Sequence, residues 1–252
     1  RFTFACSDAL NQLRLRSYIR EEDARIYCSV ELFGEKTPAL TEYRVQIRID
    51  RRQIPYYTAL REISEWWAAQ ENYAPAPVPD SARMPMYSTW YSFHQNITAD
   101  EVVNECKLAR ELGFEAVIVD DGWQTLDSSR GYAFTGDWEP ERIPDMKSFV
   151  DRVHQLGMKF LLWYSVPFIG EKAKNYQRFK EKYLRYWEGQ GTHVLDPRYP
   201  EVREFIIHTY EKALQDWNLD GFKLDFMGFF TAVEDTPMTK AQGRDYASVN
   251  EA

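Results

Sequence analysis

Three helical stretches in this chain end on a glycine that leads directly into a short apolar strand. These steps lie at Gly113, Gly157 and Gly221, and two of the strands that follow end on acids, at Asp120 and Asp225. Glycine just beyond a helix, followed by a continuous apolar run, is typical of a helix that leads into a buried parallel strand. In barrels built from such strand–helix units, side chains at the C-terminal ends of the strands form the active site. The pattern therefore predicts that the two acids share one site.

The first part of the chain has a different pattern. Residues 1–52 alternate apolar and polar side chains with a period of two, which is typical of half-exposed antiparallel strands. We expect this part to be the C-terminal end of a β-sandwich domain. Residues 53–83 then form a connection, with a helix over about 57–71 and an extended, proline-rich linker at 75–79.

From residue 84 to residue 252 the pattern changes to alternating strands and helices. We expect strands at 86–93, 116–121, 159–165, 193–196 and 221–226, and helices at 99–112, 146–156, 172–187 and 200–217. This order predicts an α/β fold containing about the first five units of a (β/α)8 TIM barrel. A closed barrel needs eight units. We therefore expect the chain to be an internal segment of a longer polypeptide, with further parts at both ends.

Composition excludes several classes of function. The net charge of −8 and the pI near 5.2 leave no basic face for a nucleic acid or an anionic membrane. A bilayer span needs about 18 consecutive apolar residues, and the sequence has no such run. The four histidines and three cysteines follow no metal-ligand spacing, so we expect neither a metal nor a cofactor. A small neutral substrate fits best, and the compartment, cytoplasm or periplasm, stays open.

Two pairs of residues carry the predicted chemistry. Lys223 and Asp225 are separated by one strand residue, so their side chains point to the same face. An acid beside a cation stays ionised and can act as a nucleophile toward a sugar carbon. Asp120 and Asp121 are adjacent acceptor-only side chains that can bind sugar hydroxyls. Each acid could instead be structural, for example as the cap of the next helix.

Three tryptophans could offer flat apolar faces to a sugar ring. Trp123 follows the acid pair, Trp138 lies in a Gly-Asp-Trp motif, and Trp90 follows the first strand. Any of them could also belong to the core, because aromatic side chains dominate protein interiors. Lys223 is the hardest of these residues to explain by packing, because lysine is almost never buried without a partner.

Six motifs in a fixed order resemble one known family. They are Trp90-Tyr91-Ser92-Phe93, Val119-Asp120-Asp121-Gly122-Trp123, Gly136-Asp137-Trp138, Lys159-Phe160-Leu161-Leu162-Trp163, Val194-Leu195-Asp196 with Pro200-Glu201-Val202-Arg203, and Phe222-Lys223-Leu224-Asp225. Over about residues 84–228 the chain resembles the melibiase-type α-galactosidases of glycoside hydrolase family 36. The part before Pro75 is similar to the end of the β-supersandwich domain in that family.

The resemblance implies a retaining α-glycosidase. Asp225 would be the nucleophile, Lys223 would contact a ring hydroxyl, and Asp120 and Asp121 would hold the hydroxyls that identify galactose. Trp138 would line the sugar site, and the general acid/base would lie beyond residue 252. The substrate would be a small carbohydrate, and the full-length protein could form a homo-oligomer.

The chain departs from the family pattern at two places. It reads Ser165-Val166-Pro167-Phe168 where the family has an acidic Glu-Pro-Glu segment, and Gln190-Gly191-Thr192-His193 where an arginine usually reaches the sugar. Three alternatives to an α-galactosidase therefore stay open: a raffinose-synthase-like transglycosylase, an α-N-acetylgalactosaminidase, and a carbohydrate-binding protein without catalysis.

Overall fold

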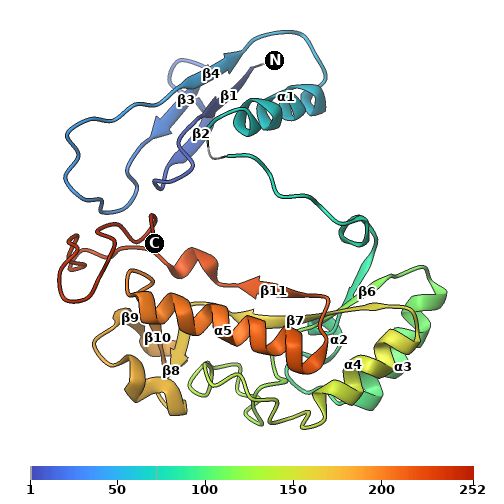
Figure 1. Cartoon of the computed structure of the whole chain (residues 1–252). Coiled ribbons are helices and arrows are strands. Elements are labelled where there is room, and N and C mark those ends of the chain that lie inside the picture. Colours follow the sequence, from blue (N-terminus) through green and yellow to red (C-terminus); the bar gives the residue numbers. More distant parts are fainter. Residues whose placement is uncertain (1, 72) are drawn as a thin grey trace. The chain divides into compact units, whose positions relative to one another are not determined.

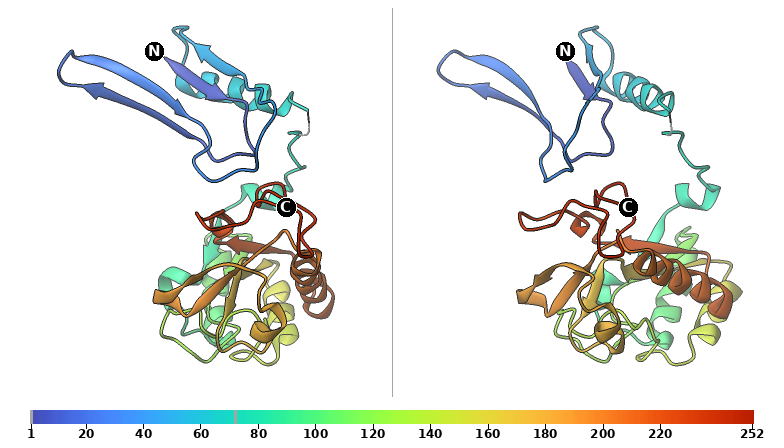
Figure 2. Two further views of the ribbon diagram at one scale, coloured as in Figure 1. Left: turned by 90° about the vertical axis from the view of Figure 1, so that its left-hand side faces the viewer. Right: turned by 60° about the vertical axis from the view of Figure 1, so that its left-hand side comes forward.

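The computed structural model describes residues 2–71 and 73–252, which form two compact units. The first unit contains the chain up to Val78 together with Ala232–Thr239 and Glu251. The second contains Pro79–Thr231, Lys240–Asn250 and Ala252. The proline-rich run 75–79 has neither helix nor strand and is extended in every view (Figures 1 and 2).

The first unit contains the antiparallel strands that the alternating pattern predicts. Strand β1 (Thr3–Cys6) pairs with β4 (Ile47–Asp50), and β2 (Arg14–Arg20) pairs with β3 (Arg25–Glu31). These pairs form separate two-stranded sheets, so the β-sandwich stays a prediction. Helix α1 (Tyr56–Ala68) confirms the predicted helix.

A four-stranded parallel sheet is the framework of the second unit. Its strands are β5 (Met86–Ser88), β6 (Ala116–Val119), β7 (Lys159–Ser165) and β11 (Gly221–Asp225), in the order β11-β7-β6-β5. Because all four strands are parallel, their C-terminal ends lie at one edge of the sheet. The three glycine steps in the sequence therefore lead into neighbouring strands.

Three helices cover one face of this sheet: α3 (Ala99–Glu111), α4 (Met146–Gln155) and α5 (Pro200–Trp217). Figure 1 shows α5 running along β7 and β11. The core between helices and sheet includes Val103 and Cys106 from α3, Phe149 and Val153 from α4, Ala213 from α5, and Val117, Phe160 and Leu162 from the strands. The side chains of alternate strand residues face the other way, and the candidate site is built on that side.

The helix ends follow the predicted signals. The Thr98 hydroxyl accepts a hydrogen bond from the Glu101 amide, and the Asp145 carboxylate caps α4 by accepting one from the Ser148 amide. Gly113 follows α3 with a φ of 90°, which favours a residue without a Cβ. Pro200 is in the first turn of α5, where its missing N–H costs no hydrogen bond.

Two expectations differ from the structure. The strand expected at 193–196 is present as β10 (Thr192–Leu195), but it pairs antiparallel with β8 (Phe168–Gly170) and β9 (Tyr183–Trp187) and not with the parallel sheet. The helix expected at 172–187 is a short 3-10 helix, η2 (Lys174–Phe179), followed by β9. Strand β9 is rich in aromatic side chains, which favour strands and pack across the sheet. The described residues therefore hold four parallel barrel strands, and a closed barrel stays a prediction.

The first expected barrel strand is also shorter than the range 86–93. Strand β5 ends at Ser88, and the one-turn helix α2 (Trp90–Phe93) follows. The remaining short 3-10 helices are η1 (Asp80–Arg83), η3 (Glu188–Gln190) and η4 (Met227–Phe229).

One carboxylate ties the N-terminal ends of β7 and β11 to α4. Oδ2 of Asp220 accepts hydrogen bonds from the Phe160 amide and from Nε2 of His154, both at 2.8 Å, and Oδ1 accepts one from Nζ of Lys159 at 2.7 Å. Burial alone would raise the pKa of Asp220, but these hydrogen bonds outweigh it and hold the pKa below its usual value.

We expect Asp220→Asn to lower the free energy of unfolding by about 1–3 kcal/mol near neutral pH, because an amide cannot satisfy all three donors. A carboxyl with a depressed folded-state pKa stabilises the fold above its unfolded pKa of about 3.9, and this contribution is lost as the pH falls further. Urea unfolding of the intact protein should therefore show a smaller difference at pH 3.5 than at pH 7. Asp216→Asn, which removes an exposed ion pair with Lys212 on α5, is the matched control and should change little. A pH-independent difference would contradict the prediction.

Candidate active site

The C-terminal ends of three neighbouring strands bring the candidate residues together. On β11 and β7, Lys223 is paired in register with Trp163, and Asp225 with Ser165. Register partners in a parallel sheet point to the same face, so these four side chains share the face opposite the helices. Strand β6 adds Asp120 immediately beyond its last residue.

Lys223 lies between two carboxylates. Its Nζ atom is 2.6 Å from Oδ2 of Asp120 and 3.4 Å from Oδ2 of Asp225. The side chain of Asp120 is only 3% exposed, whereas those of Lys223 and Asp225 are 35% and 37% exposed. Burial works to lower the pKa of Lys223, but the hydrogen bond and the charge of Asp120, together with the charge of Asp225, raise it above its usual value. Lys223 therefore stays charged between the two acids.

Both oxygens of Asp225 are held in place. Oδ2 accepts a hydrogen bond from Nε1 of Trp163 at 3.0 Å, and Oδ1 accepts one from the Phe226 amide at 2.9 Å. Phe226 has a φ of 62°, so the chain turns sharply directly after Asp225. A carboxylate that is fixed in this way and remains accessible can attack an electrophilic carbon. Sequence reasoning identified Asp225 but missed Trp163, which it treated only as part of a strand.

Asp121 is held differently from Asp120. It is 2% exposed, and its two oxygens accept hydrogen bonds at 2.7 Å from the side-chain amides of Gln95 and Gln124. Burial raises the pKa of Asp121, although both amide donors act in the opposite direction. The structure thus gives Asp121 a part in holding the loop after β6, and direct contact with a sugar stays a prediction. Neither glutamine was singled out in the sequence.

Gly122 allows this loop to close on the chain near Gln95. Its φ is 121°, and a Cβ at this position would lie 2.5 Å from the Gln95 carbonyl oxygen. Any side chain would therefore force the two segments apart. The Oε1 atom of Gln95 also accepts a hydrogen bond from the Arg130 amide, so the same glutamine connects Asp121 to the following part of the loop.

The three tryptophans lie in different environments. Trp123 is fully buried in the core and donates its indole N–H to the Trp163 carbonyl oxygen at 2.9 Å, so its expected contact with a sugar stays a prediction. Trp138 is half-buried, and its ring centroid is 6.2 Å from that of Trp163. Trp90 contacts His94 and the guanidinium of Arg130, and its contact with a sugar stays a prediction.

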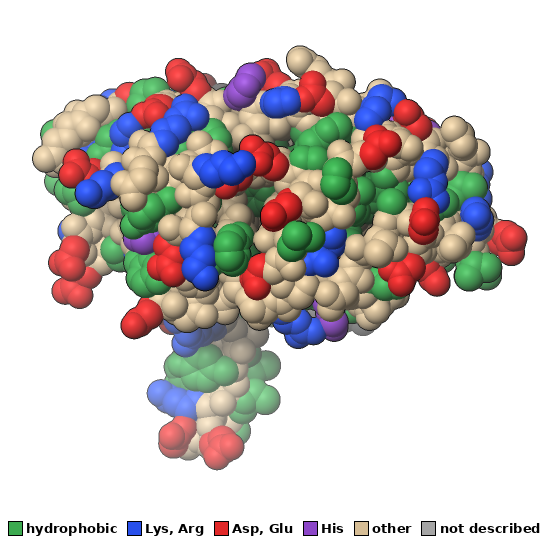
Figure 3. Space-filling view, turned by 90° about the horizontal axis from the view of Figure 1, so that it is seen from below, with side chains coloured by type: hydrophobic (Ala, Val, Ile, Leu, Met, Phe, Trp, Pro, Cys, Tyr) green, Lys and Arg blue, Asp and Glu red, His purple; other side chains and the backbone are tan. Residues whose placement is uncertain are grey.

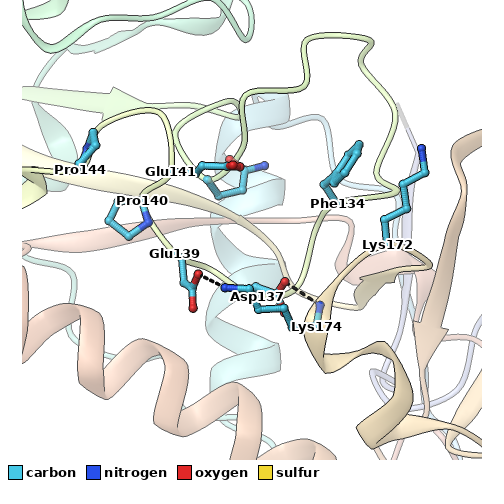
Figure 4. Close-up of a pocket in the computed structure, with 9 residues that line it drawn as sticks. Phe134, Asp137, Glu139, Pro140, Glu141, Pro144, Lys172 and Lys174 are labelled. Atoms are coloured by element: carbon cyan, nitrogen blue, oxygen red, sulfur yellow. Dashed lines mark hydrogen bonds and ion pairs between the residues drawn. The ribbon is translucent and has the colours of Figure 1, made fainter.

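A separate pocket of about 560 Å³ lies beside the loop that carries Trp138 (Figure 4). It is lined by Gln124, Phe134, Asp137, Glu139, Pro140, Glu141, Pro144, Lys172 and Lys174. Asp137 accepts hydrogen bonds from the backbone amides of Lys174 and Asn175, and Lys174 pairs with Glu139. The charged groups of Asp137, Lys174 and Glu139 are thus already bonded to neighbouring residues of the pocket wall. The residues that line the pocket do not include Lys223 or Asp225.

Charged groups elsewhere do not form a metal site. Among the residues that the structure describes, no three histidine, cysteine or acidic side chains are placed to hold a metal ion.

The face drawn in Figure 3 has basic and acidic side chains interspersed with apolar ones. None of the described helices is both long and apolar enough to cross a membrane.

Comparison with curated proteins gives partial matches. The α-galactosidase AgaA of Geobacillus stearothermophilus is 25% identical over 178 residues, which cover 67% of this chain and 24% of that enzyme. The A type blood α-D-galactosamine galactosaminidase of Flavonifractor plautii is 26% identical over 174 residues, covering 61% of this chain and 15% of that protein. The chain therefore spans about a quarter or less of the length of these relatives.

Solved structures show the same fold. A crystal structure of a Geobacillus stearothermophilus AgaA variant in complex with raffinose matches with a TM-score of 0.63 at 20% identity, covering 90% of this chain and 31% of that one. The family model described as Melibiase matches residues 69–249, well over half of the sequence. The motifs, the parallel sheet and this match agree, and the chain belongs to the melibiase family, as its resemblance to glycoside hydrolase family 36 implied.

Proposed function

We propose that this chain carries the nucleophile-bearing part of a retaining α-glycosidase that hydrolyses terminal α-galactosyl residues of oligosaccharides. One observation carries the proposal: Asp225 is accessible, is fixed through both oxygens, and lies 3.4 Å from the ammonium of Lys223. A carboxylate that is held in one orientation and open to the solvent is placed to attack an electrophilic carbon.

In this mechanism Asp225 attacks the anomeric carbon while a second carboxylic acid protonates the leaving oxygen. The bond to the leaving sugar breaks, and a covalent glycosyl-enzyme forms. Water then hydrolyses this intermediate, and the second group acts as the base. Retaining enzymes keep the two carboxyl groups about 5–5.5 Å apart. We expect the second carboxyl to come from a part of the protein outside residues 1–252.

Lys223 and Asp120 are proposed to recognise the sugar as a unit. Lys223 can donate to a ring hydroxyl while its contact with Asp120 fixes its position, since the ammonium has three donors. Asp121 supports this arrangement by holding the loop after β6 in place. We also expect Asp121 to contact the sugar directly. Trp138 would form part of the apolar wall.

A second candidate substrate is a 2-amino or 2-acetamido galactoside. At its two departures from the family pattern, the chain lacks the acidic segment and the arginine. At these two places the side-chain oxygens of Ser165 and Gln190 are buried and have no hydrogen-bond partner among the described residues. Neutral polar groups at these positions are compatible with a substituent other than a hydroxyl. The Flavonifractor plautii relative, which is named a galactosaminidase, gives this candidate additional support.

Substitution of Asp225 by alanine tests the nucleophile. We expect Asp225→Ala in the intact protein to reduce hydrolysis of an aryl α-galactoside by at least about a thousandfold, because the covalent intermediate can no longer form. Binding of galactose, measured by calorimetry, should be largely kept. Added azide should restore turnover and give the inverted glycosyl azide. The control is Asp151→Ala, which removes an exposed carboxylate of α4 that pairs with Lys147. Unchanged turnover by the Asp225 variant would refute the assignment.

Sugar identity can be tested by comparing kcat/KM for three nitrophenyl glycosides. We expect the α-galactoside to be preferred to the α-glucoside by about a hundredfold or more, or about 2.7 kcal/mol, because the epimer would lose the charge-assisted hydrogen bond that Lys223 or Asp120 makes to the galactose hydroxyl. The α-N-acetylgalactosaminide measures the second candidate directly. Product analysis in the presence of raffinose or sucrose separates hydrolysis from transglycosylation. A preference for the glucoside would contradict the role given to Asp120.

A further inference from the structure

The loop between β6 and α4 holds an aromatic residue, Tyr132, in a fixed place. The Tyr132 amide donates to the Gln190 carbonyl oxygen at 2.9 Å, and the Lys172 amide donates to that of Ala133 at 2.8 Å. The loop also rests closely on β8, since a Cβ added to Gly170 would lie 2.1 Å from the Ala133 carbonyl oxygen. Backbone contacts to two other segments therefore position Tyr132.

Its ring packs against the neighbours of Asp225. The ring centroid of Tyr132 is 6.3 Å from that of Trp163 with an interplanar angle of 22°, and 6.3 Å from that of Trp187 at 28°. Phe226 meets the same ring edge-on at 5.3 Å. Trp163 donates the hydrogen bond to Asp225, and Phe226 follows Asp225 in the chain. The Tyr132 ring thus contacts both groups that hold this carboxylate.

The hydroxyl group of Tyr132 differs in its hydrogen bonding from the hydroxyl groups of nearby tyrosines. The Tyr183 hydroxyl donates to the Tyr176 carbonyl oxygen, and the Tyr186 hydroxyl to the Glu171 carboxylate. The Tyr132 hydroxyl, by contrast, has no hydrogen-bond partner among residues 2–71 and 73–252. Burial, together with the charges of the aspartates at 121, 225 and 120, raises the pKa of Tyr132, so the hydroxyl keeps its proton.

We propose that Tyr132 determines specificity, with its hydroxyl hydrogen-bonded to one polar substituent of the pyranoside bound at Asp225. This inference rests on the proposed glycosidase function. The aspartates around the site can only accept hydrogen bonds when ionised, and lysine can only donate, whereas a phenol can do both. Tyr132 therefore adds a neutral, rigidly placed partner that the charged residues do not provide.

The test compares Tyr132→Phe with the intact wild-type protein on nitrophenyl α-galactoside and its 2-, 3-, 4- and 6-deoxy analogues. We expect kcat/KM for the parent substrate to fall about three- to tenfold, the effect of one neutral hydrogen bond. For one deoxy analogue the loss should disappear, because its partner group is already missing. The ratio of parent to analogue is measured on one preparation, so it does not depend on the fraction of active protein.

Tyr186→Phe is the matched control, since it removes a surface hydroxyl bonded to Glu171 and should leave every ratio unchanged. An equal loss on all five substrates would mean that Tyr132 only packs, and no loss on any of them would also overturn the inference. If the wild-type protein is active, either of these results leaves the proposed function intact. A wild-type protein that cleaves none of these glycosides overturns the proposed function, and the inference for Tyr132 with it.

Discussion

The position of one ammonium group between two carboxylates determines how the site is arranged. Lys223 joins β11 to the loop after β6: its pair with Asp120 reaches across β7, whereas its pair with Asp225 lies within β11. A buried carboxylate such as Asp120 is costly without a charged partner. The lysine compensates this cost and at the same time fixes the spacing between the proposed recognition group, Asp120, and the proposed nucleophile, Asp225. If these proposals hold, loss of the ammonium affects recognition and catalysis together.

A layer of buried polar and aromatic groups supports the acids of the site. Gln95 and Gln124 hold Asp121, Trp163 holds Asp225, and Trp123 donates in turn to the carbonyl oxygen of Trp163. Catalytic groups work best when their orientation is already set before the substrate arrives. Here neutral donors set the orientation of Asp121 and Asp225.

Local patterns predicted most of the second unit. Helix α5 and the ends of α3 and α4 agree with the predicted ranges because capping residues and glycines act within one turn. Residue parity on β11 was enough to place Lys223 and Asp225 on one face. The same reasoning failed at 172–187, where residues 183–187 form a strand that pairs antiparallel with the next strand, β10, and the expected helix does not form. The supporting contacts were also missed, because Trp163 lies 62 residues from Asp225 and Gln95 lies 26 residues from Asp121.

The buried Asp121 and the more exposed Asp220 should respond to acid in opposite ways. Burial raises the pKa of Asp121, so protonation relieves a desolvated charge, and a protonated carboxyl can still bond to the neutral glutamines around it. Asp220 depends on its negative charge to hold Lys159 and His154, so protonation weakens that connection. Acid unfolding of this sheet should accordingly begin at the N-terminal ends of its strands. The loop after β6 should resist acid better at Asp121, because this buried carboxyl keeps its hydrogen bonds to Gln95 and Gln124 without its charge.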